Sequence, residues 1–239
     1  MSSQFAQLQV APSESELVNT FIDAMSRVYI WMTGGLLITA VVAAFVASSD
    51  ELAALLFGGS FIFWAIIIAQ FGLVIALSAA VHKMSPTMAL GLFFIYSGLM
   101  GLTMSIVFLA YDLGTVAIAF GVTTGTFAAL SIVGLTTKKD LTKWGPLLMV
   151  SLFGLIIASI ANMFLQSPMF DYLISYLGVF LFMGLTLYST KSIKSMTFEA
   201  LSNGDAQAVS RIGVIGALQL YLSFINLFLF ILRIVGGRR

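Results

Sequence analysis

Long apolar stretches separated by short polar breaks extend along most of the chain. Seven uncharged runs of 17 to 29 residues follow one another. A transmembrane helix needs roughly 20 consecutive apolar residues, so each run predicts one membrane-spanning helix. The expected spans are Val28–Ser48, Leu52–Ala80, Thr87–Ala110, Thr115–Leu135, Pro146–Gln166, Tyr172–Tyr188 and Ile212–Leu232.

The type of secondary structure follows from the lack of alternation within these runs. Transmembrane strands alternate apolar and polar residues over about ten positions, and these runs do not. Backbone groups in hydrocarbon must be hydrogen-bonded within a helix or a closed barrel. We therefore expect an all-α membrane protein, a seven-transmembrane-helix bundle over residues 28–235. A basic tail at 236–239 follows it, and no separate soluble domain is predicted.

The first 27 residues are polar and mixed in charge. They lack the basic start and small-residue cleavage site of a signal peptide. Ser13 and Glu16 have the spacing of a capping box. The apolar residues that share one helical face behind them are Leu17, Phe21 and Met25. The segment Ser13–Arg27 is thus predicted to be a short helix on the membrane surface, with a mobile tail as the alternative.

Composition supports the membrane assignment and excludes several kinds of chemistry. The chain is 60% hydrophobic and 9% charged, whereas soluble domains carry about 25% charged residues. The partner is thus a lipid bilayer rather than nucleic acid. With no cysteine and a single histidine, His82, thiol catalysis and metal sites are disfavoured. We expect no enzymatic activity, cofactor or metal, and we interpret His82 as a solvated loop residue.

Basic residues in the predicted loops fall on one side of the membrane, and the opposite loops carry only acidic residues. This distribution predicts a cytoplasmic N-terminus by the positive-inside rule. The exception is Arg233, Arg238 and Arg239, which seven full spans would place outside. A full last span is favoured over a re-entrant hairpin. The eight basic residues on the predicted cytoplasmic side are Arg27, Lys83, Lys138, Lys139, Lys143, Lys191, Lys194 and Arg211.

Small residues recur at the spacing of helix–helix contacts. In lipid, small side chains let two backbones approach closely. We therefore expect tight helix packing at three pairs, which are Gly121 with Gly125, Gly154 with Ala158, and Gly98 with Gly101.

The last span carries a polar face. Gln219, Ser223 and Asn226 recur at i, i+4 and i+7 and so share one side of the helix. Asn162 and Gln70 are the other strongly polar groups at depth. Such residues face the bundle interior or a water-filled cavity, so either interhelical hydrogen bonds or a polar pathway would account for them. No charged residue lies well inside a span, which argues against a proton-coupled pump.

Several longer motifs resemble the Bax inhibitor-1 family, with the bacterial YccA-like members as the closer match. They cover most of the chain from about Phe21 to Gly236. The motifs are TTGTFAALSIVGLTTKKDLTKWGPLLMVSLFGLIIASIAN at Thr123–Asn162, Met84-Ser85-Pro86, Gly101-Leu102-Thr103, Gly184–Tyr188 and LYLSFINLFLFILR at Leu220–Arg233.

The resemblance implies a seven-helix bundle with the last helix central, surrounded by the other six. It also implies calcium leak across the membrane, restraint of cell death in eukaryotes, and association of YccA-like members with the membrane protease FtsH. The sequence departs from the family at its pH-sensing acidic pair, where Ser189 and Ser223 stand instead. Ala80 stands where a basic partner is expected.

The two serines are predicted to lie at similar depth. Ser189 is five residues before Lys194 and Ser223 seven after Gly216, so both lie about 7–10 Å from one membrane face, within reach of a hydrogen bond. We predict a calcium-leak or stress-modulating protein of a bacterial inner membrane, with a candidate gate formed by Ser189, Ser223, Asn226, Gln219 and Asn162. The alternative is a non-transporting protein that modulates a membrane protease.

Overall fold

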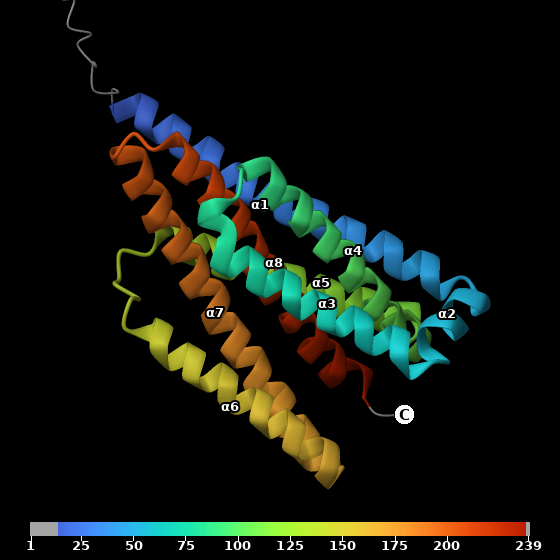
Figure 1. The fold of residues 1–239 in the computed structure, drawn as a ribbon. Helices are drawn as coiled ribbons and strands as arrows, with labels where there is room; N and C mark the ends of the chain where they lie inside the picture. The colour runs from blue at the N-terminus through green and yellow to red at the C-terminus, as the bar shows by residue number, and fades with distance from the viewer. Residues whose placement is uncertain (1–13, 238–239) are drawn as a thin grey trace, which may run out of the picture.

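The computed structural model describes residues 14–237, and all the regular secondary structure there is helical (Figure 1). The predicted Ser13 cap, the side chains of Glu16 and His82, and Arg238 and Arg239 lie outside the described residues. Seven of the helices are long and apolar enough to cross a membrane, so the predicted fold class is confirmed. The elements are α1 (Glu14–Ala47), α2 (Asp50–Phe57), α3 (Ser60–Ala80), η1 (Val81–Lys83), α4 (Pro86–Ala110), α5 (Leu113–Thr136), α6 (Trp144–Leu165), α7 (Pro168–Ser202) and α8 (Ala206–Gly236).

The first helix is longer than its apolar run. The residues predicted to form a surface helix or a tail are the first part of α1, which continues without a break to Ala47. Met25 and Val28 are both buried, so the bundle packing begins ahead of the predicted span. The structure therefore has no separate surface helix at this place.

The second apolar run is divided, because Gly58 and Gly59 separate α2 from α3. Glycine disfavours a helix by about 1 kcal/mol relative to alanine, and two in succession end one here. Ser49 caps α2 by accepting a hydrogen bond from the Leu52 N–H at 3.3 Å. The prediction of one unbroken helix over Leu52–Ala80 is therefore wrong.

The predicted polar break before the last span is mostly helical. α7 continues to Ser202 and α8 starts at Ala206, with a tight turn between them. Gly204 adopts a left-handed φ of 69°, and Asp205 caps α8 by accepting from the Ala208 N–H at 2.8 Å. α7 and α8 thus form a hairpin whose turn extends beyond the apolar runs.

α8 is the central helix of the bundle, as predicted. In its membrane-spanning window 67% of residues are buried, compared with 11% in α3 and 17% in α6. It packs against α7, α1, α5 and α4, whereas α3 packs on α4 and α6 on α7 (Figure 1). The expected ring of six helices is therefore incomplete. The 31 residues of α8 form one helix about 46 Å long, so the alternative of a re-entrant hairpin at the last span is wrong.

Close packing of α8 depends on glycines that are not among the three predicted pairs of small residues. A side chain at Gly216 would meet Ile193 at 3.1 Å, and one at Gly213 would meet Trp31 at 2.8 Å. Among the predicted pairs, Gly101 packs closely, against α1. Gly98, Gly121, Gly125 and Gly154 do not, because nothing lies within 4 Å of a Cβ position at these glycines.

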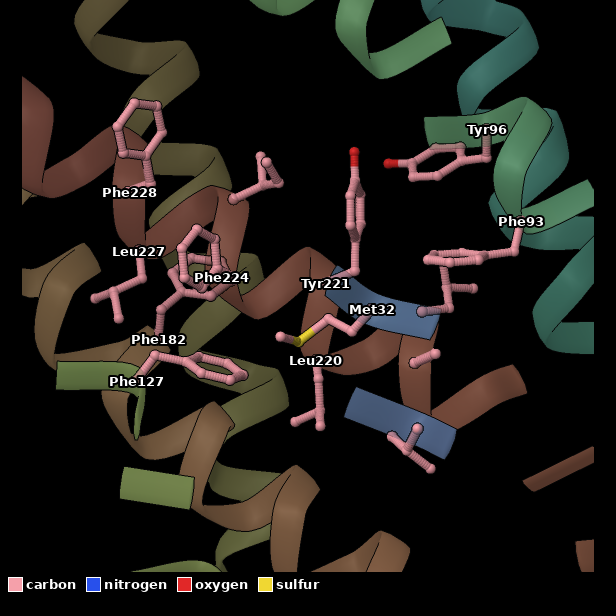
Figure 2. Packing of buried hydrophobic residues seen from close by; sticks show 14 of the residues in the cluster. Met32, Phe93, Tyr96, Phe127, Phe182, Leu220, Tyr221, Phe224, Leu227 and Phe228 are labelled. Atoms are coloured by element: carbon pink, nitrogen blue, oxygen red, sulfur yellow. The ribbon is translucent and has the colours of Figure 1, made fainter. Parts of the chain in front are cut away.

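A buried tyrosine connects three helices at the core (Figure 2). The Tyr221 hydroxyl of α8 lies 2.6 Å from the Thr39 hydroxyl of α1. Thr39 also lies 2.8 Å from the Ser97 carbonyl oxygen of α4. Since Thr39 uses its single proton on a carbonyl, Tyr221 is the donor of the shared bond. The Tyr221 ring meets Phe93 and Tyr96 edge-on at centroid distances of 5.6 and 5.9 Å.

The two ends of the bundle differ in charge. At the end where α6 begins and the α7–α8 hairpin turns, here called the basic end, the chain carries a group of lysines. At the opposite, acidic end lie the α4–α5 and α6–α7 turns. The lysines are Lys83, Lys138, Lys139, Lys143, Lys191 and Lys194, and the acidic residues are Asp50, Glu51, Asp112 and Asp171.

Candidate functional site

A cavity of about 1080 Å³ lies beside the central helix, between α3 and α4 on one side and α6 and α7 on the other. We call it the α8 cavity. Its lining on α6 extends from Gly145 to Met163, a rise of about 27 Å and close to the thickness of a bilayer core. The cavity therefore follows most of the depth of the membrane.

Four predicted gate residues line this cavity, and they come from two helices. Ser223 and Ser189 are largely buried, Asn226 is partly buried and Gln219 is exposed. Gln70 of α3 lines the same space. The polar face of α8 therefore meets an open volume rather than a packed neighbour. Sequence reasoning missed four further hydroxyl-bearing residues in the lining, which are Tyr96, Ser159, Tyr188 and Ser192.

Two of the three amide groups in the cavity, those of Asn226 and Gln70, donate hydrogen bonds to the protein. Asn226 Nδ2 donates to the Leu222 carbonyl oxygen at 2.8 Å. Gln70 Nε2 donates to the Leu99 carbonyl oxygen at 2.8 Å and to Thr103 Oγ1 at 3.2 Å. An amide has two donor protons and one carbonyl acceptor. The arrangement therefore leaves both side-chain carbonyl oxygens as hydrogen-bond acceptors toward the cavity.

Ser189 and Ser223 are not a hydrogen-bonded pair. No hydrogen bond joins their hydroxyls, both of which lie in the described part of the chain. The register of the α7–α8 hairpin explains why, since Ile193 packs on Gly216. α7 and α8 run antiparallel, so a residue four positions before Ile193 lies opposite one about four positions after Gly216. Ser189 therefore lies opposite Leu220, one helical turn away from Ser223. That offset is about 5 Å along the helix axis.

Two other predicted positions lie elsewhere. Asn162 is at the acidic end, where its Oδ1 accepts from the Ser167 N–H at 3.2 Å and its Nδ2 lies 3.4 Å from Asp171 Oδ1. It stabilises the α6–α7 turn and does not line the α8 cavity. Ala80 is the last residue of α3 and is also outside the cavity lining. The structure thus does not bring Ala80 to the two serines.

The α8 cavity is uncharged. None of its lining residues is Asp, Glu, Lys, Arg or His. Its walls on α3 and α6 include apolar side chains that are exposed at the protein surface, such as Phe71 at 68% and Met163 at 71%. The cavity is therefore open toward the lipid side of the bundle.

Two aromatic rings of the lining lie on the side of the α8 cavity that faces Arg233 and Asp171. Phe182 and Phe230 stack with centroids 5.8 Å apart, and both line the cavity. Arg233, one turn further along α8, lies over the Phe230 ring at 5.4 Å. Its Nη1 is 3.6 Å from Asp171 Oδ1. Beyond Phe230 lies a second, smaller cavity of about 240 Å³, lined by Tyr111, Pro168, Asp171, Tyr172, Arg233 and Gly237.

At the basic end, lysines of α7 bind the end of α5. Lys191 Nζ donates to the Thr137 carbonyl oxygen at 2.9 Å, and Lys194 Nζ donates to that of Leu135. Cations at a helix C-terminus are favoured by the unsatisfied carbonyls and the helix dipole. These contacts fix the cavity wall formed by α7 relative to α5.

The carboxylate of Asp140 stabilises the loop 137–143 between α5 and α6. The Thr142 hydroxyl and N–H donate to Asp140 Oδ1 at 2.6 and 2.9 Å. These hydrogen bonds hold the pKa of Asp140 below its ordinary value, with smaller contributions from nearby lysines. The loop leads directly into α6, which forms the outer wall of the α8 cavity.

The fold defines a multi-pass α-helical membrane protein with a buried last helix beside an uncharged cavity. Residues 18–239 match the family described as inhibitor of apoptosis-promoting Bax1. The chain belongs to the Bax inhibitor-1 family, as its motifs predicted.

Bacterial relatives cover nearly the whole chain. The inner membrane protein YbhL of Escherichia coli K12 is 44% identical over 90% of this chain and 92% of its own length. An uncharacterized protein of Borreliella burgdorferi has the same identity and coverage. An uncharacterized protein of Deinococcus radiodurans is 36% identical over 96% of this chain and 97% of its own length. The resemblance is therefore to whole proteins, without additional domains in these relatives.

Proposed function

We propose that the protein is a passive, non-enzymatic leak pathway for cations in a bacterial inner membrane, with Ca²⁺ as the candidate ion. The observation that carries the proposal is that the polar face of α8 meets a cavity of about 1080 Å³. The amide oxygens of Gln70 and Asn226 and the serine hydroxyls supply the oxygen ligands that hard cations prefer. In this proposal the basic end faces the cytoplasm, following the positive-inside rule.

The lack of charge in the cavity sets the character of the leak. A divalent ion that loses hydration water gains no carboxylate there, so conduction is expected to be slow and weakly selective. Serine hydroxyls and amides do not titrate near neutral pH. The leak is therefore expected to be nearly independent of pH, unlike the one that the acidic pair of the family implies.

The two stacked rings supply a candidate gate. Phe230 lines the α8 cavity, and Arg233, which lies over its ring, lines the smaller cavity at the acidic end, so we place the gate at this ring. The structure is thus interpreted as the closed state. Movement of the Phe230 ring away from Phe182 would join the two cavities into a path through most of the membrane.

Calcium entry into dye-loaded proteoliposomes tests this proposal. Phe230→Ala should increase the rate several-fold, and Phe230→Leu should give an intermediate rate. Phe228→Ala is the matched control, since Phe228 lies on the same helix but packs against Phe120 of α5. Equal rates for all variants and for empty liposomes would contradict the proposed pathway. Thermal unfolding of each variant in detergent separates a leak from a loss of folding.

A second function, modulation of a membrane protease, is supported by the α7–α8 hairpin. α7 has 35 residues, about 15 more than a membrane crossing needs, so the hairpin turn extends beyond the bilayer core at the basic end. This projection is a suitable docking surface. Substitutions at its exposed tip, such as Asn203→Arg, should abolish co-purification with the protease while leaving calcium entry unchanged. Co-purification that is unchanged by these substitutions would remove support for this alternative.

A further inference from the structure

The α8 cavity is accessible from within the bilayer. α3 and α6 form its outer walls and are the two least buried spans of the bundle. Phe71 on α3 and Ile160 and Met163 on α6 line the cavity and are 51 to 71% exposed. In a membrane these exposed side chains contact lipid. The volume of about 1080 Å³ is slightly above the range of about 300–1,000 Å³ typical of ligand pockets.

The polar groups in the cavity define what such a ligand carries. Asn226 and Gln70 present carbonyl oxygens, since Gln70 donates both of its amide protons to the protein and Asn226 donates one of its two. The Ser159 hydroxyl donates to the Leu155 carbonyl oxygen at 2.8 Å, which leaves its oxygen as an acceptor. A complementary ligand therefore carries a group that donates to these oxygens, and its own acceptors can meet hydroxyls such as those of Ser192 and Tyr188, which also line the cavity. An anionic phosphate, itself an acceptor, would find no cation among the lining residues.

The depth of these groups also selects an uncharged ligand. Ser223 lies at the middle of the apolar run Ile212–Leu232, and Asn226 is one turn from it. A charged headgroup at this depth would be strongly disfavoured, whereas a hydroxyl that finds an acceptor is tolerated. Diacylglycerol has this chemistry, because it joins two acyl chains to one uncharged primary hydroxyl.

We propose that the α8 cavity binds diacylglycerol, which enters from the bilayer between α3 and α6 and donates its hydroxyl proton to the amide oxygens. Its acyl chains would lie against the apolar walls. The binding site stands without the leak. The regulatory consequence, that the bound lipid occupies the ion path and slows it, rests on the proposed function.

Photolabelling of the purified full-length protein in nanodiscs tests the binding site. The probe is diacylglycerol with a diazirine in one acyl chain. Crosslinks should concentrate on α3 and α6. Unlabelled diacylglycerol should compete at least tenfold better than its 3-O-methyl ether or phosphatidylglycerol. Equal competition by the methyl ether would overturn the role of the hydroxyl, and equal competition by phosphatidylglycerol would overturn selection for an uncharged headgroup.

Two substitutions that fill the cavity provide the structural control. Ser159→Trp and Met149→Trp should each reduce labelling at least fivefold, because both positions line the cavity. Gly121→Trp adds the same ring on the outward face of α5, where nothing lies within 4 Å of a Cβ, and should not reduce it. Labelling that is spread over α5 and unchanged by both cavity substitutions would refute the site.

Flux measured on the same samples separates the two proposals. Added diacylglycerol should slow calcium entry by wild-type protein. Ser159→Trp also narrows the proposed ion path, so its entry rate is compared with and without diacylglycerol and should be the same in both. Labelling confined to the cavity without any calcium entry would overturn the leak and retain the lipid site. Calcium entry with labelling outside the cavity would overturn the lipid site and retain the leak.

Discussion

Removal of the Tyr221 hydroxyl should cost the bundle about 1 kcal/mol. Tyr221 is fully buried and Thr39 is 4% exposed. Phe at this position keeps the ring contacts with Phe93 and Tyr96 and loses the 2.6 Å bond to Thr39. A typical intramolecular hydrogen bond contributes about 0.5–1.5 kcal/mol, and interhelical bonds in membrane proteins average about 0.6 kcal/mol. Tyr221→Ala should instead cost roughly 3–5 kcal/mol, because it creates a cavity.

A double-mutant cycle isolates this bond. The free energy of unfolding is measured by titration with a denaturing detergent for Tyr221→Phe, Thr39→Val and the double variant. We expect a coupling energy of about 1 kcal/mol, because the second substitution finds the bond already lost. Tyr176→Phe, on an exposed tyrosine of α7, should have no effect. Additive costs, or a Phe variant as unstable as Tyr221→Ala, would refute the assignment of this bond to the core.

Two further predictions concern the ends of the bundle. The chain has no native cysteine, so single cysteines can be introduced at exposed Met169 and at Lys139. Because the basic end is proposed to be cytoplasmic, the cysteine at Met169 should react with an impermeant thiol reagent in intact cells and the one at Lys139 should not. The reverse pattern would overturn the orientation. Asp171→Asn and Arg233→Gln should each lower the unfolding free energy by up to about 1 kcal/mol, as for a partly exposed ion pair. The double variant should be no less stable than either single one in the same titration, and additive losses would show that the pair does not couple.

The number of spans could be predicted from the sequence, because the bilayer thickness sets a minimum apolar length. The full lengths of the helices could not. Residues beyond the apolar runs, such as Lys191 and Glu199, are good helix formers, and α7 continues through them. Hydropathy therefore marks where a helix is in the membrane, and it does not mark where the helix ends.

The candidate site was predicted in part for a related reason. The periodicity of Gln219, Ser223 and Asn226 identified a shared helix face, and these side chains line one cavity. The role of Asn162 was missed because polarity at depth does not distinguish a residue in a cavity from one that caps a turn. Gln70 depends on a contact between α3 and α4, which periodicity within one helix cannot reveal.

The small-residue motifs were the least informative signal. Gly121 and Gly125 have the spacing of a helix-packing motif but face outward in the described chain. Gly213 and Gly216, which let α8 approach its neighbours, lie three residues apart. Their importance comes from which helix is central, and the spacing of glycines does not encode that.

The most direct test of the proposed pathway is the pH dependence of calcium entry between about pH 6 and 8, where carboxylates with raised pKa values titrate. Wild-type protein should give a flat profile, because none of the lining residues of the α8 cavity is Asp, Glu, His, Lys or Arg. The double variant Ser189→Asp/Ser223→Asp should give a profile that changes several-fold, since each carboxylate would stand in the ion path. A steep wild-type profile, or a flat profile for the double variant, would contradict conduction through the α8 cavity.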